Sequence, residues 1–355
     1  MGRSRRHRAV RAAATALVAM GPLLSLMALP GAALAAGQPK TLCTIRDQRL
    51  TELSGLAADE SWWYGVPDGG SSLKVYVLDR SCAVRKVITG GIDPYDVEDL
   101  ALATDGTLWL ADTGDNRSKR DTVAVHTLRP DGTARMYRLT YPDGKHDAEA
   151  LLLGPSGVPH IVTKNVLGSA GVYRPDRTLR SPGPTPLTKV AEVAIPGSDT
   201  PGGPVGTVSS ALITGGAVSR DGTLVALRTY TDAYLYPAPR GHLVEALSRE
   251  PVRIPLPNEP QGEAIALTPD GTMLSAGEGA SQPLRAVRDV AGVVARAERD
   301  ARSEPAATVD SESPEEIDRV AGLKPLPAAA AALMITGVVW FGVRLVRKLR
   351  DRMGR

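Results

Sequence analysis

The sequence predicts an all-β fold, a β-propeller, lying between an N-terminal signal peptide and one C-terminal transmembrane helix. Three observations favour this fold class. Short β-branched runs alternate with turn residues, and the chain has 36 Gly and 28 Pro among its 355 residues. One strand–turn–strand pattern recurs at intervals of about 50 residues, which is typical of propeller blades. Both ends carry an apolar segment beside a cluster of basic residues.

Residues 1–35 have the order of a secretory signal peptide. A basic start is followed by Ala12–Leu34, which is rich in Ala, Leu, Val and Met, and Ala33-Leu34-Ala35 provides a small-x-small cleavage site. An uncleaved signal anchor is the alternative. In either case the sequence predicts that the chain is exported.

Residues 326–346 are expected to form the transmembrane helix. Leu326–Val343 carries no charge, and at 1.5 Å per residue it measures about 27 Å, close to the roughly 30 Å of a hydrocarbon core. The basic tail 347–355 is expected in the cytoplasm and the remainder outside, because positive loops stay inside. A buried core helix is the alternative. Residues 285–325 are expected to form a stalk, with a short helix over Val287–Ala301 and a disordered Ser-, Pro- and Glu-rich part after it.

The charge distribution excludes nucleic acid as a partner. The net charge is +3, but the basic residues gather at the two ends and leave the middle mildly acidic, whereas phosphate binding needs a clustered basic face. The two cysteines, Cys43 and Cys82, both fall in the exported part, so a disulfide between them is predicted. Two unpaired buried thiols are the alternative.

The repeat predicts a propeller over residues 41–284. Its copies are Ser54–Ala57, Glu98–Asp112, Glu149–Gly157, Thr214–Gly222 and Glu263–Gly271. Five blades are favoured, and Thr41–Arg46 would supply the missing outer strand of the fifth blade and close the ring. The long interval from Gly157 to Gly222 leaves a sixth blade open, and a β-sandwich is the other alternative.

Four carboxylates take equivalent positions in the repeats. In a propeller, the residues that enter the innermost strands line one mouth of the central channel, and here they include Glu98, Asp99, Glu149 and Glu263. Converging carboxylates repel one another, so they bind a cation, pair with a basic group, or raise their pKa values. Oxygen ligands suit Ca²⁺ or Mg²⁺, so these four residues are candidate metal ligands and Ca²⁺ is the candidate cofactor.

The second strands of the repeats also carry charged residues at equivalent positions, namely Asp112, Lys164, Arg228 and Glu278. Lys164 and Arg228 can neutralise Glu149 and Glu263 in a buried network, or they can hold an anion beside a cation. Three interpretations stay open for the mouth, namely a structural charge network, a cation site and a catalytic site. For catalysis the candidates are Glu149, His146, Lys164 and Arg228. No nucleophile elbow, zinc-protease helix or phosphate loop occurs in the sequence.

Several motifs resemble those of a group of secreted, membrane-anchored actinobacterial propeller proteins, largely of unassigned function. The motifs are Asp96-Val-Glu-Asp-Leu-Ala101, Ala111-Asp-Thr-Gly-Asp-Asn-Arg117, Tyr141–Leu152, Ala226–Leu235 and Pro260–Ala266. The resemblance covers roughly residues 50–279 and implies the propeller fold without an activity. The short elements Glu149-Ala-Leu and Gly262-Glu-Ala-Ile also resemble phytase-like esterase propellers, which implies Ca²⁺ and phosphate-ester chemistry. The dense acidic motifs of a propeller phytase are absent from the sequence.

The expected function is that of a membrane-tethered, extracytoplasmic propeller that binds a small ligand or an envelope partner. The alternative is a Ca²⁺-dependent phosphoesterase or lactonase that acts at the propeller mouth. The two expectations differ in whether the recurring acids hold a metal ion and activate water, or only recognise a ligand.

Overall fold

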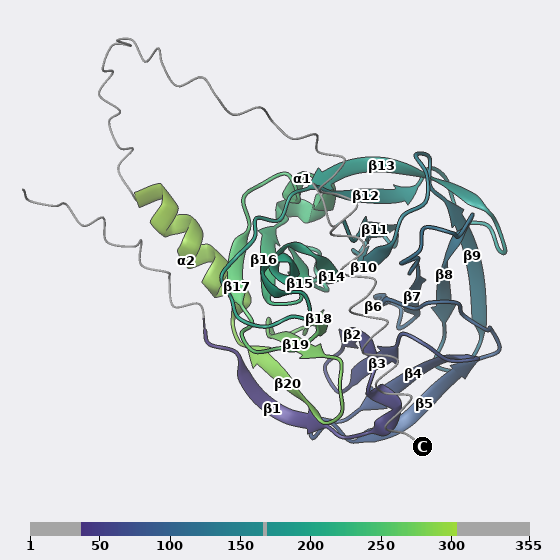
Figure 1. Cartoon of the computed structure of the whole chain (residues 1–355), viewed down its shortest axis with the longest axis horizontal. Coiled ribbons are helices and arrows are strands. Elements are labelled where there is room, and N and C mark those ends of the chain that lie inside the picture. The colour runs from purple at the N-terminus through teal and green to yellow at the C-terminus, as the bar shows by residue number, and fades with distance from the viewer. Residues whose placement is uncertain (1–36, 166–168, 304–355) are drawn as a thin grey trace, which may run out of the picture. The chain divides into compact units, whose positions relative to one another are not determined.

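The computed structural model describes residues 37–165 and 169–303 of the chain (Figure 1). Within these ranges no helix is both long enough and apolar enough to cross a membrane. The predicted signal peptide 1–35, transmembrane helix 326–346 and basic tail 347–355 lie outside the described residues, as does the later part of the predicted stalk. The described part is all-β apart from short helices, and its architecture is propeller-like, as the sequence predicts.

Five four-stranded antiparallel units follow one another along the chain. The first is β2 (Leu53–Ala58), β3 (Trp63–Pro67), β4 (Leu73–Leu78) and β5 (Val84–Gly90); the second is β6 (Asp99–Leu102), β7 (Leu108–Asp112), β8 (Val123–Leu128) and β9 (Ala134–Thr140). The third is β10 (Ala148–Leu153), β11 (Pro159–Thr163), β12 (Ala170–Pro175) and β13 (Thr185–Val193); the fourth is β14 (Ile213–Val218), β15 (Leu224–Thr229), β16 (Asp232–Pro237) and β17 (Val252–Pro255). The fifth is β18 (Gly262–Leu267), β19 (Met273–Gly277), β20 (Gln282–Val287) and, as its outer strand, β1 (Lys40–Ile45).

The first strands of the units form a ring (Figure 1). Strand β2 contacts β6 and β18, strand β10 contacts β6 and β14, and β14 contacts β18. A short parallel pairing between β13 and β9 also joins the outer strands of the third and second units. The long interval between the third and fourth repeats holds the 3-10 helix η2 (Gly206–Ala211), and no sixth sheet occurs among the described residues. The remaining short helices are η1 (Gln48–Leu50), η3 (Pro239–Gly241) and α1 (Leu243–Ala246).

Apolar packing between neighbouring units explains why the ring closes. Each of the five buried hydrophobic clusters combines residues of two adjacent units, and one of them joins the fifth unit to the first. A single small sheet would leave both of its apolar faces in water, so each unit is stable only between two neighbours. The clusters consist mainly of Val, Leu, Ile, Ala and Tyr, as expected for a chain whose single Phe lies at position 341.

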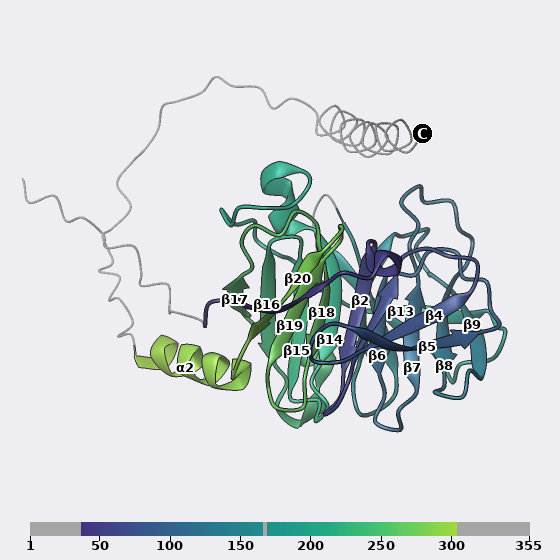
Figure 2. The same cartoon turned by 90° about the horizontal axis from the view of Figure 1, so that it is seen from below.

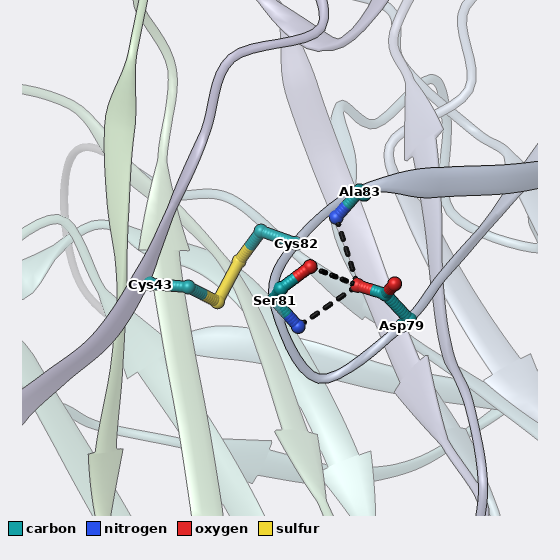
Figure 3. Close-up of a disulfide and its surroundings, with 5 residues drawn as sticks. All are labelled: Cys43, Asp79, Ser81, Cys82 and Ala83. Carbon is teal, nitrogen blue, oxygen red and sulfur yellow. Dashed lines mark hydrogen bonds between the residues drawn. A yellow bond between two sulfur atoms is a disulfide. The ribbon is translucent and has the colours of Figure 1, made fainter.

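Strand β1 closes the ring, and a disulfide fixes it there. Strand β1 pairs antiparallel with β20 in the fifth unit, as predicted. Cys43 of β1 is bonded to Cys82 in the β4–β5 turn of the first unit, with 5.8 Å between the two Cα atoms (Figure 3). Asp79 holds that turn, because one carboxylate oxygen accepts hydrogen bonds from the Ser81 N–H at 2.8 Å and the Ala83 N–H at 3.1 Å. The predicted disulfide is therefore confirmed.

A helix docks where the sequence predicts the beginning of the stalk. Strand β20 continues to Val287, past the expected domain end at 284, and α2 (Val290–Ser303) follows it. Val290, Val293 and Val294 are buried among residues of the fourth and fifth units. Figure 2 shows α2 projecting to the side of these units. The Val290 N–H donates to the Gly271 carbonyl in the β18–β19 turn, so α2 starts at the end of the molecule opposite to the start of β18.

We expect the Cys43–Cys82 bond to stabilise the closed ring. Replacing both cysteines by Ala is expected to lower the free energy of unfolding by about 3–4 kcal/mol, because the bond closes a loop spanning a sequence separation of 39 residues. Guanidinium denaturation of the described domain, with and without a reductant, measures the difference. A variant as stable as the oxidised wild type would show that β1 is held by strand pairing alone.

Candidate functional site

The first residues of the innermost strands meet at one end of the ring. Ser54, Glu98, Glu149, Thr214 and Glu263 take equivalent positions and are all buried. In the four units other than the second, the pairing of the first two strands shifts by one residue at this position. Such a β-bulge redirects a side chain. The bulges therefore account for the way Ser54, Glu149, Thr214 and Glu263 gather at one place, whereas Glu98 directly precedes β6 and lies there without a bulge.

Three carboxylates of the second and third units lie close enough to share one cation. Carboxylate oxygens of Glu98, Asp147 and Glu149 all lie within 4.8 Å of one another. The hydroxyl of Ser54 donates to the Glu98 carbonyl at 2.7 Å and lies 3.4 Å from the Glu98 carboxylate. A Cβ atom at Gly114 would lie 2.1 Å from Glu98 Oε1, so only glycine leaves room for the carboxylate here.

Lys164 is the cation that faces these acids. Its Nζ donates to Glu149 Oε1 at 2.8 Å and lies 5.0 Å from the centre of the Tyr230 ring. Burial by itself lowers the pKa of Lys164, but the charge of Glu149, supported by Tyr230 and Glu263, outweighs burial and holds the pKa well above its ordinary value. Lys164 therefore stays charged and neutralises one carboxylate.

Two further carboxylates come from the fifth unit. The amide of Gln261 donates to Glu278 Oε2 at 2.5 Å and to Glu263 Oε1 at 3.4 Å. The second oxygen of Glu263, Oε2, is buried without a hydrogen-bond partner among the described residues. We call the set Glu98, Asp147, Glu149, Glu263 and Glu278, together with Lys164, the acid mouth.

Negative charge exceeds positive charge in the acid mouth, and the pKa values reflect this. Burial, followed by the charge of Glu149, raises the pKa of Asp147 to about 7. Burial and the charges of Asp68 and Glu52 raise the pKa of Glu278 to about 8. The pKa values of Glu98 and Glu263 lie well above their ordinary value, mainly because both carboxyl groups are buried. These four groups thus bind a proton more readily than free carboxylates, and a cation would compete for the same oxygens.

Asp99 has a different position from its neighbour Glu98. Its carboxylate is fully buried and accepts three backbone hydrogen bonds, from Leu100 at 2.8 Å, Leu151 at 2.7 Å and Gly216 at 3.0 Å. These residues belong to β6, β10 and β14, so one side chain joins the innermost strands of three units. Burial raises the pKa of Asp99 well above its ordinary value despite the three N–H donors. Asp99 therefore stabilises the ring of innermost strands and is not part of the acid mouth.

Arg228 joins the fourth and fifth units. It is fully buried, and its side chain donates to the carbonyls of four residues and, at 2.8 Å, to Glu259 Oε2. The four residues are Thr229, Tyr230, Ala264 and Ala276. The five N–H donors of the guanidinium are thereby used, which leaves none for a ligand. The ion-pair partner of Arg228 is Glu259 and not Glu263, whereas Lys164 does pair with Glu149 as the sequence suggests.

The other two candidates lie outside the acid mouth. His146 Nε2 is 2.9 Å from Asp143 Oδ1, and the imidazole meets the Tyr141 ring edge-on at 4.9 Å. Asp112 accepts hydrogen bonds from the backbone of Tyr95 and Asp96, forms an ion pair with Arg120 and lies within hydrogen-bond distance of His126 Nε2, all between 2.9 and 3.0 Å. Hydrogen bonds, an ion pair and a ring contact with neighbouring residues thus hold both side chains outside the acid mouth.

Asp147 and Gln261 belong to the site, but neither is among the candidates predicted from the sequence. A signal was available: an acid or amide stands two residues before the inner glutamate in Asp96-Val-Glu98, Asp147-Ala-Glu149 and Gln261-Gly-Glu263. Residues two apart in an extended chain point to the same side, so both side chains of each pair face the site.

Comparison with solved structures gives distant likenesses. No family model and no curated protein matches the chain. A gluconolactonase from Xanthomonas campestris is 13% identical, with a TM-score of 0.37, over 63% of this chain and 68% of that one. A PQQ-bound aldose sugar dehydrogenase from Streptomyces coelicolor is 11% identical, with a TM-score of 0.38, over 70% of this chain and 98% of that one. A luciferin-regenerating enzyme is 11% identical, with a TM-score of 0.39, over 67% and 78%. No substrate or reaction follows from likenesses at this level.

The raised pKa values predict how stability depends on pH when no cation is present. Between about pH 4 and pH 8 the folded state holds protons that the unfolded state has lost, so the free energy of unfolding falls as pH rises through this window. Glu278→Gln removes one such group, and we expect a flatter decline than in wild type. Urea denaturation in chelator at pH 5, 6, 7 and 8 measures the slopes. Glu60→Gln, an exposed carboxylate in the β2–β3 turn, is the control. Equal slopes in all three proteins would contradict the raised pKa of Glu278.

Proposed function

We propose that this chain is a membrane-tethered, extracytoplasmic propeller that binds a divalent cation at the acid mouth and, through it, an oxygen-rich ligand. The observation that carries the proposal is the convergence of carboxylate oxygens of Glu98, Asp147 and Glu149 within 4.8 Å. Two buried acids and one half-buried acid with one neighbouring ammonium leave uncompensated charge, which costs several kcal/mol unless protons or a cation balance it. Carboxylate oxygens are the ligands that Ca²⁺ prefers.

The donor set fits a cation that also holds a ligand. Ca²⁺ takes 6–8 oxygen ligands, whereas Glu98, Asp147 and Glu149 offer one nearby atom each. Several coordination positions would therefore remain for water or for ligand oxygens. Lys164, fixed by Glu149 and the Tyr230 ring, adds a positive charge beside these positions. Hydroxyl, carboxylate or phosphate oxygens are the groups that this combination recognises.

Hydrolysis of a phosphate ester or a lactone is the second candidate function. The observation that favours it is Glu263 Oε2, a buried carboxylate oxygen without a hydrogen-bond partner among the described residues. A bound cation would polarise the ester oxygen. Glu263 would accept the proton of the attacking water, and Lys164 would stabilise the charge that develops on the substrate. Neither role requires Arg228 or His146.

The tether belongs to the same proposal. The predicted signal peptide 1–35 and transmembrane helix 326–346 would export the domain and hold it at the outer face of the membrane, with tail 347–355 in the cytoplasm. The Cys43–Cys82 disulfide supports export, because such bonds persist in oxidising compartments. We expect the full chain to sediment with membranes and to be accessible to protease in intact cells, and a chain ending at residue 325 to be released. Recovery of the full chain in the soluble cytoplasm would contradict the tether.

Calcium binding to the purified ectodomain tests the cation site. We expect wild type to bind Ca²⁺ in calorimetry, and Glu98→Gln and Asp147→Asn to weaken binding about tenfold or more, because each removes a charged ligand. Both variants should fold, since these carboxyl groups have raised pKa values and the amides resemble their protonated forms. Glu60→Gln is the matched control and should bind like wild type.

The same proteins, together with Glu263→Gln, separate binding from hydrolysis. Turnover of 4-nitrophenyl phosphate or of a simple lactone that requires Ca²⁺ and is lost in Glu263→Gln would favour the enzyme. Calcium binding without turnover would favour the ligand-binding function. Wild type that takes up no Ca²⁺, or variants that bind it as well as wild type, would overturn the cation site.

A further inference from the structure

A cavity lies beside the acid mouth and differs from it in chemical character. It measures about 370 Å³, which is within the range of small-ligand sites. Its walls come from the segment around η1, from the β3–β4 loop and from the loop that leads into β6. All of these belong to the first unit or to the link between the first and second units.

The cavity adjoins the acid mouth through neighbouring residues. Val97, which lines the cavity, is followed directly by Glu98 of the acid mouth. The carbonyl of Thr51, another lining residue, accepts a hydrogen bond from the N–H of Gly279, the residue after Glu278, at 2.7 Å. Glu52 and Asp68 also line the cavity, and their charges act on Glu278. A ligand bound at the acid mouth therefore has this cavity as its neighbour.

One part of the cavity is basic. Arg49 and Lys74 both line it. Arg49 is held in place by Asp47, with Nε–Oδ1 and Nη2–Oδ2 distances of 2.8 and 2.6 Å, and by the Tyr76 ring, 5.0 Å from its Cζ atom. Within residues 37–165 and 169–303, no hydrogen-bond acceptor is assigned to Arg49 Nη1 and no ion pair to Lys74. These donors are the ones that an anion could use.

The rest of the lining is apolar or acidic. Val66, Pro67, Leu73 and Val97 supply hydrocarbon surface that suits a ring or a short chain. Glu52 and Asp68 repel an anion from the side that adjoins Glu278 and can accept hydrogen bonds from hydroxyl groups. This distribution of charge would orient a ligand. Its anionic group would lie toward Arg49 and Lys74, and its uncharged body would lie between these two residues and the acid mouth.

We propose that this cavity is a second ligand subsite, which takes a carboxylate, phosphonate or phosphate group carried on an apolar or ring-shaped body and binds it through Arg49 and Lys74. The acid mouth would hold the other end of the same ligand, so the inference rests on the proposed function for that end only. The ligand class that follows is a two-part molecule, with cation-binding oxygens at one end and an anionic group at the other.

Phenylphosphonate is a suitable probe, because it combines a ring with a dianion and contains no ester to hydrolyse. We expect the wild-type ectodomain to bind it in chelator, as measured by calorimetry or by chemical-shift changes. Lys74→Gln and Arg49→Gln are each expected to weaken binding about tenfold, since each removes a charge-assisted hydrogen bond. Lys40→Gln, an exposed lysine of β1, is the matched control and should bind like wild type. Wild type that does not bind the probe, or binding that neither substitution weakens, would overturn the proposal.

The test separates the two sites. Phenylphosphonate binding in chelator that Glu98→Gln leaves unchanged supports the subsite without relying on a cation. Lys74-dependent phosphonate binding in a protein that takes up no Ca²⁺ would uphold the subsite and overturn the cation site. Calcium binding in a protein that does not bind the phosphonate would do the reverse.

Discussion

The buried carboxylate of Asp99 is the interaction on which the arrangement of the site depends. It accepts N–H groups from β6, β10 and β14 and so fixes three innermost strands relative to one another. Hydroxyl groups extend the same pattern, because Thr113 donates to the Ala148 carbonyl and Thr214 to the Gly262 carbonyl, at 2.7 and 2.8 Å. Buried polar groups are tolerated only when they are paired. The acids of the mouth can therefore converge because a fully satisfied polar network holds their strands together.

That convergence brings together more negative charge than the described residues neutralise. Arg228 is committed to Glu259 and Lys164 to Glu149, so Glu98, Asp147, Glu263 and Glu278 have no ion-pair partner of their own among the described residues. Protons can balance this charge, as the raised pKa values of Asp147 and Glu278 indicate. A divalent cation can balance it as well and would release those protons. Under the proposed function, binding of the cation would displace protons from these carboxyl groups. The neighbouring cavity, with Arg49 and Lys74, would then determine which ligand the cation binds.

Much of the fold could be predicted from the sequence, because its signals are local or repeated. Turn glycines at intervals of about 50 residues, with one longer interval, marked the units. The missing outer strand of the fifth unit pointed to β1, and the expected export of both cysteines pointed to the Cys43–Cys82 bond. The side chains were harder to predict. Glu98 and Asp99 look alike in the sequence, but adjacent residues of a strand point to opposite sides, so one faces the mouth and the other the ring. The pairing of Arg228 with Glu259, which lies outside the repeat in the loop before β18, left no sequence signal. Docking of α2 was not predicted, because the short helix was expected to belong to the stalk, although Val290, Val293 and Val294 lie at a helical spacing.

Anomalous scattering from crystals of the ectodomain soaked with Tb³⁺, a substitute for Ca²⁺, tests the central claim most directly. If the acid mouth binds a cation, we expect one strong anomalous peak about 2.3–2.6 Å from carboxylate oxygens of Glu98, Asp147 and Glu149. A peak elsewhere, or none while these three carboxylates contact only Lys164 and each other, would show that the acid mouth is balanced by protons and is not a metal site.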